Sequence, residues 1–269
     1  MTVLFSINTS ASWAQMSRMY TTQDGLPTSD IYDIHVDSRG WAWVSGIASL
    51  SLFDGSNFYN LLNWSYAPTF NTVRGVREGH DGKMWIYTRN GLYHYDSVLN
   101  KFDHIFLSED EDSVKGMSVQ GFIDYPKEGY RLVMTDENGI IIFNQETMEV
   151  DTELTDRLMA VFPDNMCTKA CIDRDGTLWT MGIRLRRIDL KRMKLMEISM
   201  SEDAARVVTD HRVDCMIEQK TTGNILIATG GGLLIFDHET QTLRTLKGGH
   251  TNMPVSVVKE TTDGRVIVG

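Results

Sequence analysis

The sequence has few of the residues that cross-link small domains. It contains 3 cysteines and 5 prolines in 269 residues, and three cysteines are too few for a disulfide framework. Cys167 and Cys171 lie four positions apart in one predicted strand, about 13 Å along an extended chain, which is too far for a disulfide unless the strand breaks. Cys215 falls in the equivalent strand of the next repeat. We therefore expect three free, slowly reacting thiols.

The sequence also lacks the common catalytic motifs. It contains no serine nucleophile elbow, no His-Glu-x-x-His and no paired-cysteine motif. Gly230-Gly231-Gly232 is not followed by the Lys-Ser/Thr of a phosphate loop, which favours a hairpin turn. The seven histidines occupy different positions of the repeat described below, so they are not expected to converge. These absences predict no catalytic residues, no metal ligands and no cofactor.

Positive charge and long apolar runs are scarce as well. The net charge is −10, which argues against a nucleic-acid partner. No segment approaches the ~20 apolar residues of a membrane span. The acidic run 108–113 lacks the spaced ligands of a calcium loop, so a solvated loop is preferred. The basic cluster 184–194 could bind an anionic sugar or a carboxylate, but a solvated, salt-bridged strand is favoured.

A repeat is the strongest positive feature. Residues 71–106 contain two turn dipeptides, Asp81-Gly82 and Asn90-Gly91, between runs of strand-forming residues, as in a four-stranded antiparallel meander. The glycine of the first turn recurs at intervals of 42, 47, 47, 47 and 41 residues, at Gly40, Gly82, Gly129, Gly176, Gly223 and Gly264. Four strands in a period of roughly 40 to 50 residues are typical of a propeller blade.

The predicted fold is therefore all-β: a β-propeller of four-stranded antiparallel blades, with five complete blades and a partial sixth. The propeller would span residues 16–269, with blades at approximately 20–62, 70–107, 116–154, 164–199, 210–246 and 254–269. Large residues recur at one position of the second strand, as at Trp43, Trp85 and Trp179. Recurrence at one position favours packing between blades over a ligand-stacking role.

The first fifteen residues do not belong to the repeat. Val3–Ile7 is a short apolar run, and Ser12-Trp13-Ala14 has the small-x-small form of a signal-peptidase site. Residues 1–15 are interpreted as the remainder of an export signal, although an edge strand is the alternative. At the other end, Gly264–Gly269 aligns with the second strand of a blade, so we expect an open ring. Such a ring would expose Val257 and Ile267, and copies of the chain should associate through these apolar residues.

The connection between the first two blades carries three aromatic residues. Exposed aromatics with polar neighbours hold sugar rings, but aromatics can equally plug the groove between blades, and the sequence leaves both readings open. The connection into a blade and the second hairpin turn of that blade share one end of a meander, which adds two arginines. The predicted ligand-binding residues are Trp64, Tyr66, Phe70, Arg74 and Arg89.

The repeat resembles a known family. Gly25-Leu26-Pro27, the motif Asp37-Ser38-Arg39-Gly40-Trp41-Ala42-Trp43, and Thr88-Arg89-Asn90-Gly91-Leu92 followed by Tyr95-Asp96 resemble the two-component regulator propeller repeat. That repeat forms the periplasmic sensor region of hybrid two-component histidine kinases in polysaccharide-degrading Bacteroidetes. The resemblance covers residues 20–269 and implies a periplasmic front fragment of a membrane-anchored parent.

The resemblance implies a non-enzymatic sensor that binds an oligosaccharide or another small ligand. Its partners would be the downstream propeller, β-sandwich and kinase modules of a parent that forms a homodimer. Two alternatives stay open. One is a metal-dependent propeller lyase, which would need a His/Glu cluster at the channel mouth. The other is a cell-surface or secretion scaffold that binds protein.

Overall fold

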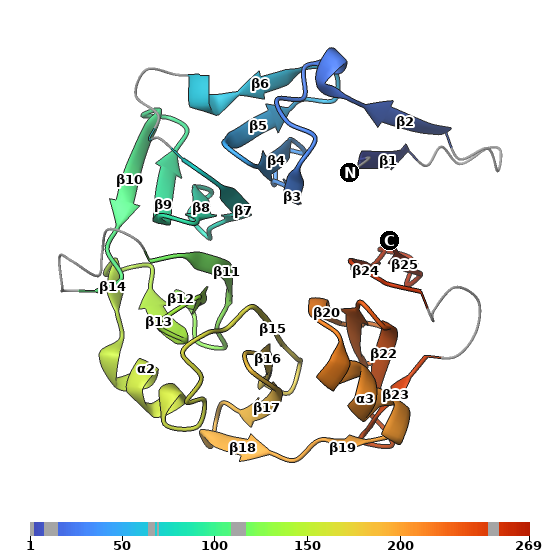
Figure 1. The fold of residues 1–269 in the computed structure, drawn as a ribbon. Coiled ribbons are helices and arrows are strands. Elements are labelled where there is room, and N and C mark those ends of the chain that lie inside the picture. The colour runs from blue at the N-terminus through green and yellow to red at the C-terminus, as the bar shows by residue number, and fades with distance from the viewer. Residues whose placement is uncertain (1–2, 8–15, 64–67, 69, 109–116, 247–252) are drawn as a thin grey trace. The chain divides into compact units, whose positions relative to one another are not determined.

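The computed structural model describes residues 3–7, 16–63, 68, 70–108, 117–246 and 253–269. Most of the strands lie in four-stranded antiparallel sheets (Figure 1), which confirms the predicted all-β fold of propeller-type blades. The chain divides into two compact units, residues 1–119 and 120–269. That the sheets of both units belong to one propeller stays a prediction.

Unit 1 contains a two-stranded hairpin and two four-stranded meanders, each in sequential strand order. The hairpin pairs β1 (Val3–Ile7) with β2 (Met16–Tyr20), and the short helices η1 (Thr22–Asp24) and η2 (Leu61–Asn63) lie in connections. Blade one consists of β3 (Ile31–Val36), β4 (Ala42–Gly46), β5 (Ser49–Phe53) and β6 (Phe58–Asn60). Blade two consists of β7 (Val73–Glu78), β8 (Met84–Thr88), β9 (Gly91–Asp96) and β10 (Lys101–Ile105).

Unit 2 contains three larger sheets and a two-stranded sheet. Blade three is β11 (Val119–Asp124), β12 (Tyr130–Thr135), β13 (Ile140–Asn144) and β14 (Glu149–Val150), and blade four is β15 (Lys169–Ile172), β16 (Thr177–Met181), β17 (Leu185–Asp189) and β18 (Lys194–Met196). Blade five is β20 (Val213–Glu218), β21 (Ile225–Thr229), β22 (Gly232–Asp237) and β23 (Thr242–Thr245), to which β19 (Ser199–Met200) adds in parallel. The strands β24 (Val258–Glu260) and β25 (Val266–Val268) start a further repeat, here called blade six.

The structure describes parts of both ends of the chain, for which the sequence makes specific predictions. Val3–Ile7 forms a strand, while residues 8–15, with the cleavage-like Ser12-Trp13-Ala14, lie outside the described residues. That residues 1–15 are the remainder of an export signal stays a prediction. Val257 and Ile267 are exposed, and association of the chain through them also stays a prediction. No helix among the described residues is long and apolar enough to cross a bilayer.

In the described part of the chain, two α-helices interrupt the expected succession of strands. Helix α2 (Thr152–Met159) follows blade three, and α3 (Glu202–Asp210) follows blade four. Asp151 and Ser201 cap their first turns by accepting hydrogen bonds from backbone N–H groups. The helices bury Leu158 and Ala204. The strand repeat predicts neither helix, because both lie in connections between blades. There, the alternation of apolar and polar residues that identifies strands gives no information about the structure.

The Asp-x-x-Gly-x-x-Trp motif forms one local hydrogen-bonded unit. In blade one, Asp37 Oδ1 accepts from the backbone of the first turn, and Asp37 Oδ2 accepts from Trp43 Nε1 at 3.1 Å. In blade four, Asp173 binds its own turn and accepts from Trp179 Nε1 at 3.0 Å. Both indoles are at most 1% exposed, so the predicted packing role of the tryptophans is confirmed.

The Thr-x-x-Gly motif serves the second turn in the same way. Thr88 Oγ1 donates to the Gly91 carbonyl at 3.0 Å and accepts from Asn90 N at 2.9 Å. Thr229 repeats both contacts, with its Oγ1 donating to the Gly232 carbonyl at 2.7 Å. Both threonines are fully buried. The hydroxyl therefore satisfies backbone groups that the tight turn leaves unpaired.

The third turn of each complete blade begins with an Asx turn. An Asp or Asn at the end of the third strand accepts hydrogen bonds from backbone N–H groups two and three residues later. These residues are Asp54, Asp96, Asn144, Asp189 and Asp237. The recurrent residues of the repeat thus build the blades, and binding residues must be sought among those that do not recur.

The structure confirms three free cysteines but corrects one placement. Cys167 precedes β15 rather than lying in it, and its Sγ is 2.9 Å from Thr180 Oγ1. Cys171 lies in β15, and Cys215 lies in the equivalent strand β20, as expected. Burial raises the pKa of Cys167 to about 12, and it also raises the pKa of Cys171.

We expect Cys167 and Cys171 to react slowly with a thiol reagent in the native chain at neutral pH, because the thiolate is the reactive form and burial disfavours it. Titration with an aromatic disulfide should give at most one fast thiol, Cys215, and three thiols after denaturation without reductant. A titre of one in the denatured protein would reveal a disulfide and contradict the prediction.

Candidate ligand-binding site

The aromatic residues predicted to bind a ligand are only partly described. Trp64 and Tyr66 lie outside the described residues. Phe70 is 3% exposed, and its ring centroid lies 4.8 Å from that of Tyr93 and 6.1 Å from that of Phe102. A buried ring offers no face to a sugar, and Phe70 packs in a core cluster with residues of blades one and two, so for Phe70 the structure favours the alternative of filling the groove between blades.

The two predicted arginines lie at the same end of blade two. Val73 pairs with Thr88 at one end of the β7–β8 ladder. Arg74 and Arg89 are the next residues in the chain after this pair, so both lie near that end. Arg89 is exposed, whereas Arg74 is half-buried and donates from Nη2 to Ser118 Oγ at 3.1 Å. The structure therefore brings these two residues to one end of the blade, without showing what they bind.

The arginines of the basic cluster do not form a common patch. Arg186 makes two hydrogen bonds to the buried carboxylate of Asp164, at 2.7 and 3.2 Å. The guanidinium carbon of Arg187 lies 5.2 and 4.8 Å from the ring centroids of Trp179 and Phe236, which are themselves in contact. Burial lowers the pKa of Arg187. The guanidinium group of Arg186 is therefore engaged by Asp164, and that of Arg187 packs on rings of blades four and five.

Asp164 provides a test of how this pair contributes to stability. Burial opposes ionisation most strongly, but the hydrogen bonds from Arg186 and from the backbone of Ile183 and Arg184, with the charge of Arg186, together outweigh it and lower the pKa of Asp164. A carboxylate with a depressed folded pKa stabilises above its unfolded pKa, near 3.9, and loses that contribution as pH falls through the folded pKa.

We therefore expect Asp164→Asn to cost about 1–3 kcal/mol at pH 7, and the difference from the original protein to shrink between pH 4 and pH 2. Urea denaturation at four pH values measures this. A difference that is independent of pH would contradict the assignment.

A pocket of about 400 Å³ opens between blades three and four of unit 2. It lies where the first turns of the two blades meet the third turn of blade four. Its walls are turn residues together with Asp124 and Ile172, the last residues of strands β11 and β15. They are Asp124, Tyr125, Pro126, Ile172, Asp173, Arg174, Asp175, Gly176 and Lys191.

The pocket combines apolar surface with charged rims. Tyr125 and Ile172 are half-buried, and Pro126 is exposed. Burial raises the pKa of Tyr125, so its phenol is neutral and can donate or accept a hydrogen bond. The Asp175 carboxylate is 61% exposed. Among the described residues, no carboxylate lies within ion-pairing distance of the exposed Lys191 ammonium.

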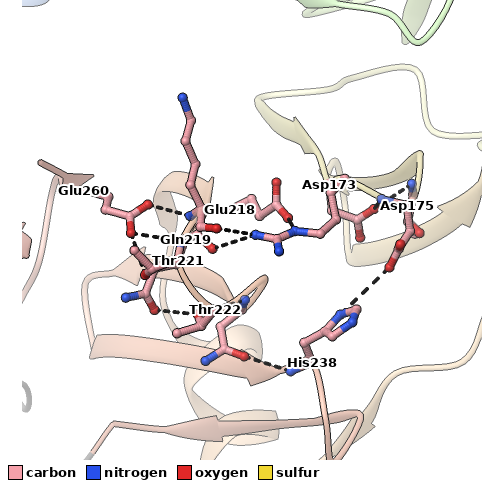
Figure 2. Close-up of polar contacts among 12 residues, drawn as sticks. Asp173, Asp175, Glu218, Gln219, Thr221, Thr222, His238 and Glu260 are labelled. Atoms are coloured by element: carbon pink, nitrogen blue, oxygen red, sulfur yellow. Dashed lines mark hydrogen bonds and ion pairs between the residues drawn. The ribbon is translucent and has the colours of Figure 1, made fainter. Parts of the chain in front are cut away.

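Arg174, although it lines the pocket, is engaged elsewhere. Its guanidinium binds the Glu218 carboxylate at 2.5 Å and donates to the backbone carbonyls of Gln219 and Lys220 at 3.3 and 2.6 Å. Figure 2 shows this network running between the first turns of blades four and five, with Asp175 facing His238 at 3.9 Å. Lys191, Asp175 and Tyr125 are therefore the groups left to meet a ligand.

The pocket was not predicted from the sequence, because the predicted ligand-binding residues belong to the opposite end of a blade, where its second turn lies. One signal was present: blade three replaces the four-residue Asp-x-x-Gly turn by the five residues Tyr125-Pro126-Lys127-Glu128-Gly129, which is one residue longer. A departure from the repeat at a turn marks a position where folding does not dictate the residue.

The described residues contain no group of three or more His, Cys, Asp or Glu side chains that could hold a metal ion. The alternative of a metal-dependent lyase therefore receives no support from the described part of the chain.

Comparison with known proteins places the fold. No family model matches the sequence, and no curated protein matches it. Among solved structures, the extracellular domain of the hybrid two-component system BT3049 from Bacteroides thetaiotaomicron is similar over 93% of this chain and 34% of its own, with a TM-score of 0.74 and 18% identity. The extracellular domain of BT4673 from the same organism is similar over 91% of this chain and 35% of its own, with a TM-score of 0.69 and 14% identity.

A secretion component shares the fold as well. PorZ, a surface component of the type-IX secretion system of Porphyromonas gingivalis, is similar over 99% of this chain and 43% of its own, with a TM-score of 0.64 and 15% identity. The chain thus spans about a third of the length of the two solved Bacteroides extracellular domains and less than half of the solved PorZ chain. At these identities the likeness establishes the fold, which this chain shares with extracellular domains of Bacteroides hybrid two-component systems.

Proposed function

We propose that this chain is the ligand-sensing part of an exported two-component signalling protein, and that it binds an oligosaccharide in the pocket between blades three and four. The observation that carries the proposal is the pocket itself, which sets apolar faces beside the exposed ammonium of Lys191 and the exposed carboxylate of Asp175. The likeness to extracellular domains of hybrid two-component systems supports the sensor role.

Sugar recognition fits this chemistry. A pyranose ring presents an apolar C–H face and an edge of hydroxyl groups. Tyr125, Pro126 and Ile172 supply an apolar surface for the face, while Asp175 accepts from hydroxyls and Lys191 donates to them. The volume of about 400 Å³ suits two or three sugar rings rather than a polymer.

In the proposed setting the parent protein is anchored in the inner membrane and this region lies in the periplasm. Binding would shift this region against the downstream propeller and β-sandwich modules of a homodimer and thereby switch a histidine kinase across the membrane. The region itself performs no catalysis. The sequence resemblance and the extracellular nature of the structural neighbours support this arrangement.

Calorimetric titration with a panel of oligosaccharides of two to six sugars, both neutral and uronate-containing, tests the ligand class. Replacing Lys191 or Asp175 by Ala should weaken binding about 5- to 30-fold each, the effect of one charge-assisted hydrogen bond. Lys194→Ala is the matched control, because Lys194 is equally exposed in blade four but does not line the pocket.

If no member of the panel binds, or if all three variants bind alike, the pocket is not an oligosaccharide site. The predicted surface in unit 1 is the rival location within the same titration. There, Trp64→Ala should weaken binding by about 1–2 kcal/mol, and Arg89→Ala should weaken it as well. A loss confined to these two variants would move the site to unit 1.

A protein-binding scaffold is the second candidate, favoured by the likeness to PorZ. A scaffold would need a broad exposed surface and not a pocket. Failure of every oligosaccharide, together with retention of a secretion component on the immobilised chain, would favour this candidate.

A further inference from the structure

In three pairs of adjacent blades, a glutamate at the end of the first strand joins its blade to the preceding one. The last residue of the first strand is Glu78 in blade two, Glu218 in blade five and Glu260 in blade six. Each of these carboxylates bonds to the first turn of the preceding blade. We call this contact, between the strand-ending glutamate and the preceding turn, the glutamate latch.

The latch uses the carboxylate as an acceptor from the turn. In unit 1, Glu78 accepts from Ser38 N at 2.7 Å and from Ser38 Oγ at 2.6 Å. In unit 2, Glu260 accepts from Lys220 N at 2.5 Å, from Thr221 N at 3.2 Å and from Thr221 Oγ1 at 2.7 Å (Figure 2). The Thr221 hydroxyl and these amides lower the pKa of Glu260.

Between blades four and five the same position is used with a side-chain donor. Glu218 accepts from Arg174 Nε at 2.5 Å, and Arg174 reaches the backbone of the turn that follows Glu218. Ser38, Lys220 and Arg174 are the second residue after the first strand of their blades. The latch therefore has a fixed donor position and a fixed acceptor position.

Blades three and four lack both halves of the latch. A backbone hydrogen bond across the first turn fixes the equivalence, because Tyr125 N donates to the Tyr130 carbonyl as Asp173 N donates to the Thr177 carbonyl. The acceptor position in blade four is then Ile172, and the donor position in blade three is Pro126. Isoleucine has no acceptor, and proline has no N–H.

The missing latch coincides with the pocket. Pro126 and Ile172 both line it, so the space that a glutamate side chain crosses at the three latched interfaces is open here. The two replacements also convert a polar bridge into the apolar surface on which a sugar face could pack. One pair of residues therefore accounts for both the cavity and its chemistry.

We propose that Pro126 and Ile172 determine the ligand site by deleting the latch, so that a ligand bound between blades three and four supplies the link that glutamate supplies elsewhere. The oligosaccharide in this inference rests on the proposed function. The missing latch rests only on the residues and contacts of the ligand-free chain. Occupancy would then tighten one interface of unit 2 while the latched interfaces stay unchanged.

Hydrogen exchange of the ligand-free chain tests the missing link without knowledge of the ligand. We expect the first-turn amides of residues 125–129 to exchange about tenfold faster than those of residues 37–41 and 219–224, which a latch protects or spans. Equal exchange in the three turns would overturn the inference.

A grafted latch provides the converse test. The double variant Pro126→Ser with Ile172→Glu reproduces the Ser38–Glu78 pair and should slow exchange of residues 125–129 about tenfold. The same variant should lose more than tenfold of its affinity for the best-binding oligosaccharide of the panel, since the new side chain crosses the pocket. Pro126→Ser alone is the matched control, because it restores the donor without the acceptor.

Removal of an existing latch separates this effect from general loosening. Glu78→Gln should speed exchange of residues 37–41 and leave oligosaccharide affinity unchanged, because Glu78 does not line the pocket. A double variant that exchanges no more slowly than the control would overturn the inference. Slowed exchange in a chain that binds no oligosaccharide would overturn the proposed ligand and leave the missing latch standing.

Discussion

Replacing Trp179 by Ala is expected to lower the free energy of unfolding of unit 2 by about 3–5 kcal/mol, the usual cost of deleting a buried aromatic side chain. The indole is fully buried in the core that blades four and five share. Its ring centroid lies 4.6 Å from that of Phe236, and the guanidinium of Arg187 lies over its face. Alanine would remove this packing and leave the half-buried Arg187 with only one of its two aromatic contacts, the ring of Phe236.

Two further variants separate the contributions. Trp179→Phe keeps an aromatic ring but deletes the hydrogen bond to Asp173, so we expect a smaller loss, about 1–2 kcal/mol. Trp41→Ala is the surface control, because Trp41 is 38% exposed, and its loss should stay below about 1 kcal/mol. Urea denaturation followed by far-UV circular dichroism measures all three. A loss for Trp179→Ala no larger than that for Trp41→Ala would contradict the packing role.

The blades were predictable because their determinants are local. Asp37 and Trp43 are six residues apart and bond to each other and to the turn between them. Thr88 and Gly91 close the next turn through one hydroxyl. A determinant that acts within a few residues leaves a motif of fixed spacing, and repetition of the motif reveals the blade.

The pocket was not predictable because its determinants are distant in the sequence. Pro126 and Ile172 become a pair only when blades three and four pack, and neither residue type suggests a binding site. Phe70 shows the same limit in reverse, because an aromatic residue in a loop resembles a ligand contact until its neighbours in blade two bury it. The spacing of residues in the sequence therefore predicts contacts within a blade. Contacts between blades become known only from the folded structure of each unit.

Replacing Gly139 by Ala is the second change with a large expected effect, because two independent costs add. Gly139 has a φ of 66°, which costs a residue with a Cβ about 1–2 kcal/mol. A Cβ would also lie 2.7 Å from the Asp164 carbonyl oxygen and 2.5 Å from Met159 Cε. The backbone carbonyl cannot swing aside as a side chain can, so overpacking adds about 1–3 kcal/mol.

Gly176→Ala is the matched control in the same unit. Its φ of 78° imposes the same backbone cost, but its Cβ would meet only Lys191 Cε at 3.9 Å, an ordinary contact. The difference between the two variants in urea denaturation therefore isolates the close approach of the second turn of blade three to the Asp164 segment. We expect Gly139→Ala to be the less stable by about 1–3 kcal/mol. Equal losses would mean that the Asp164 segment can move away at no cost, and that this connection does not fix blade three against blade four.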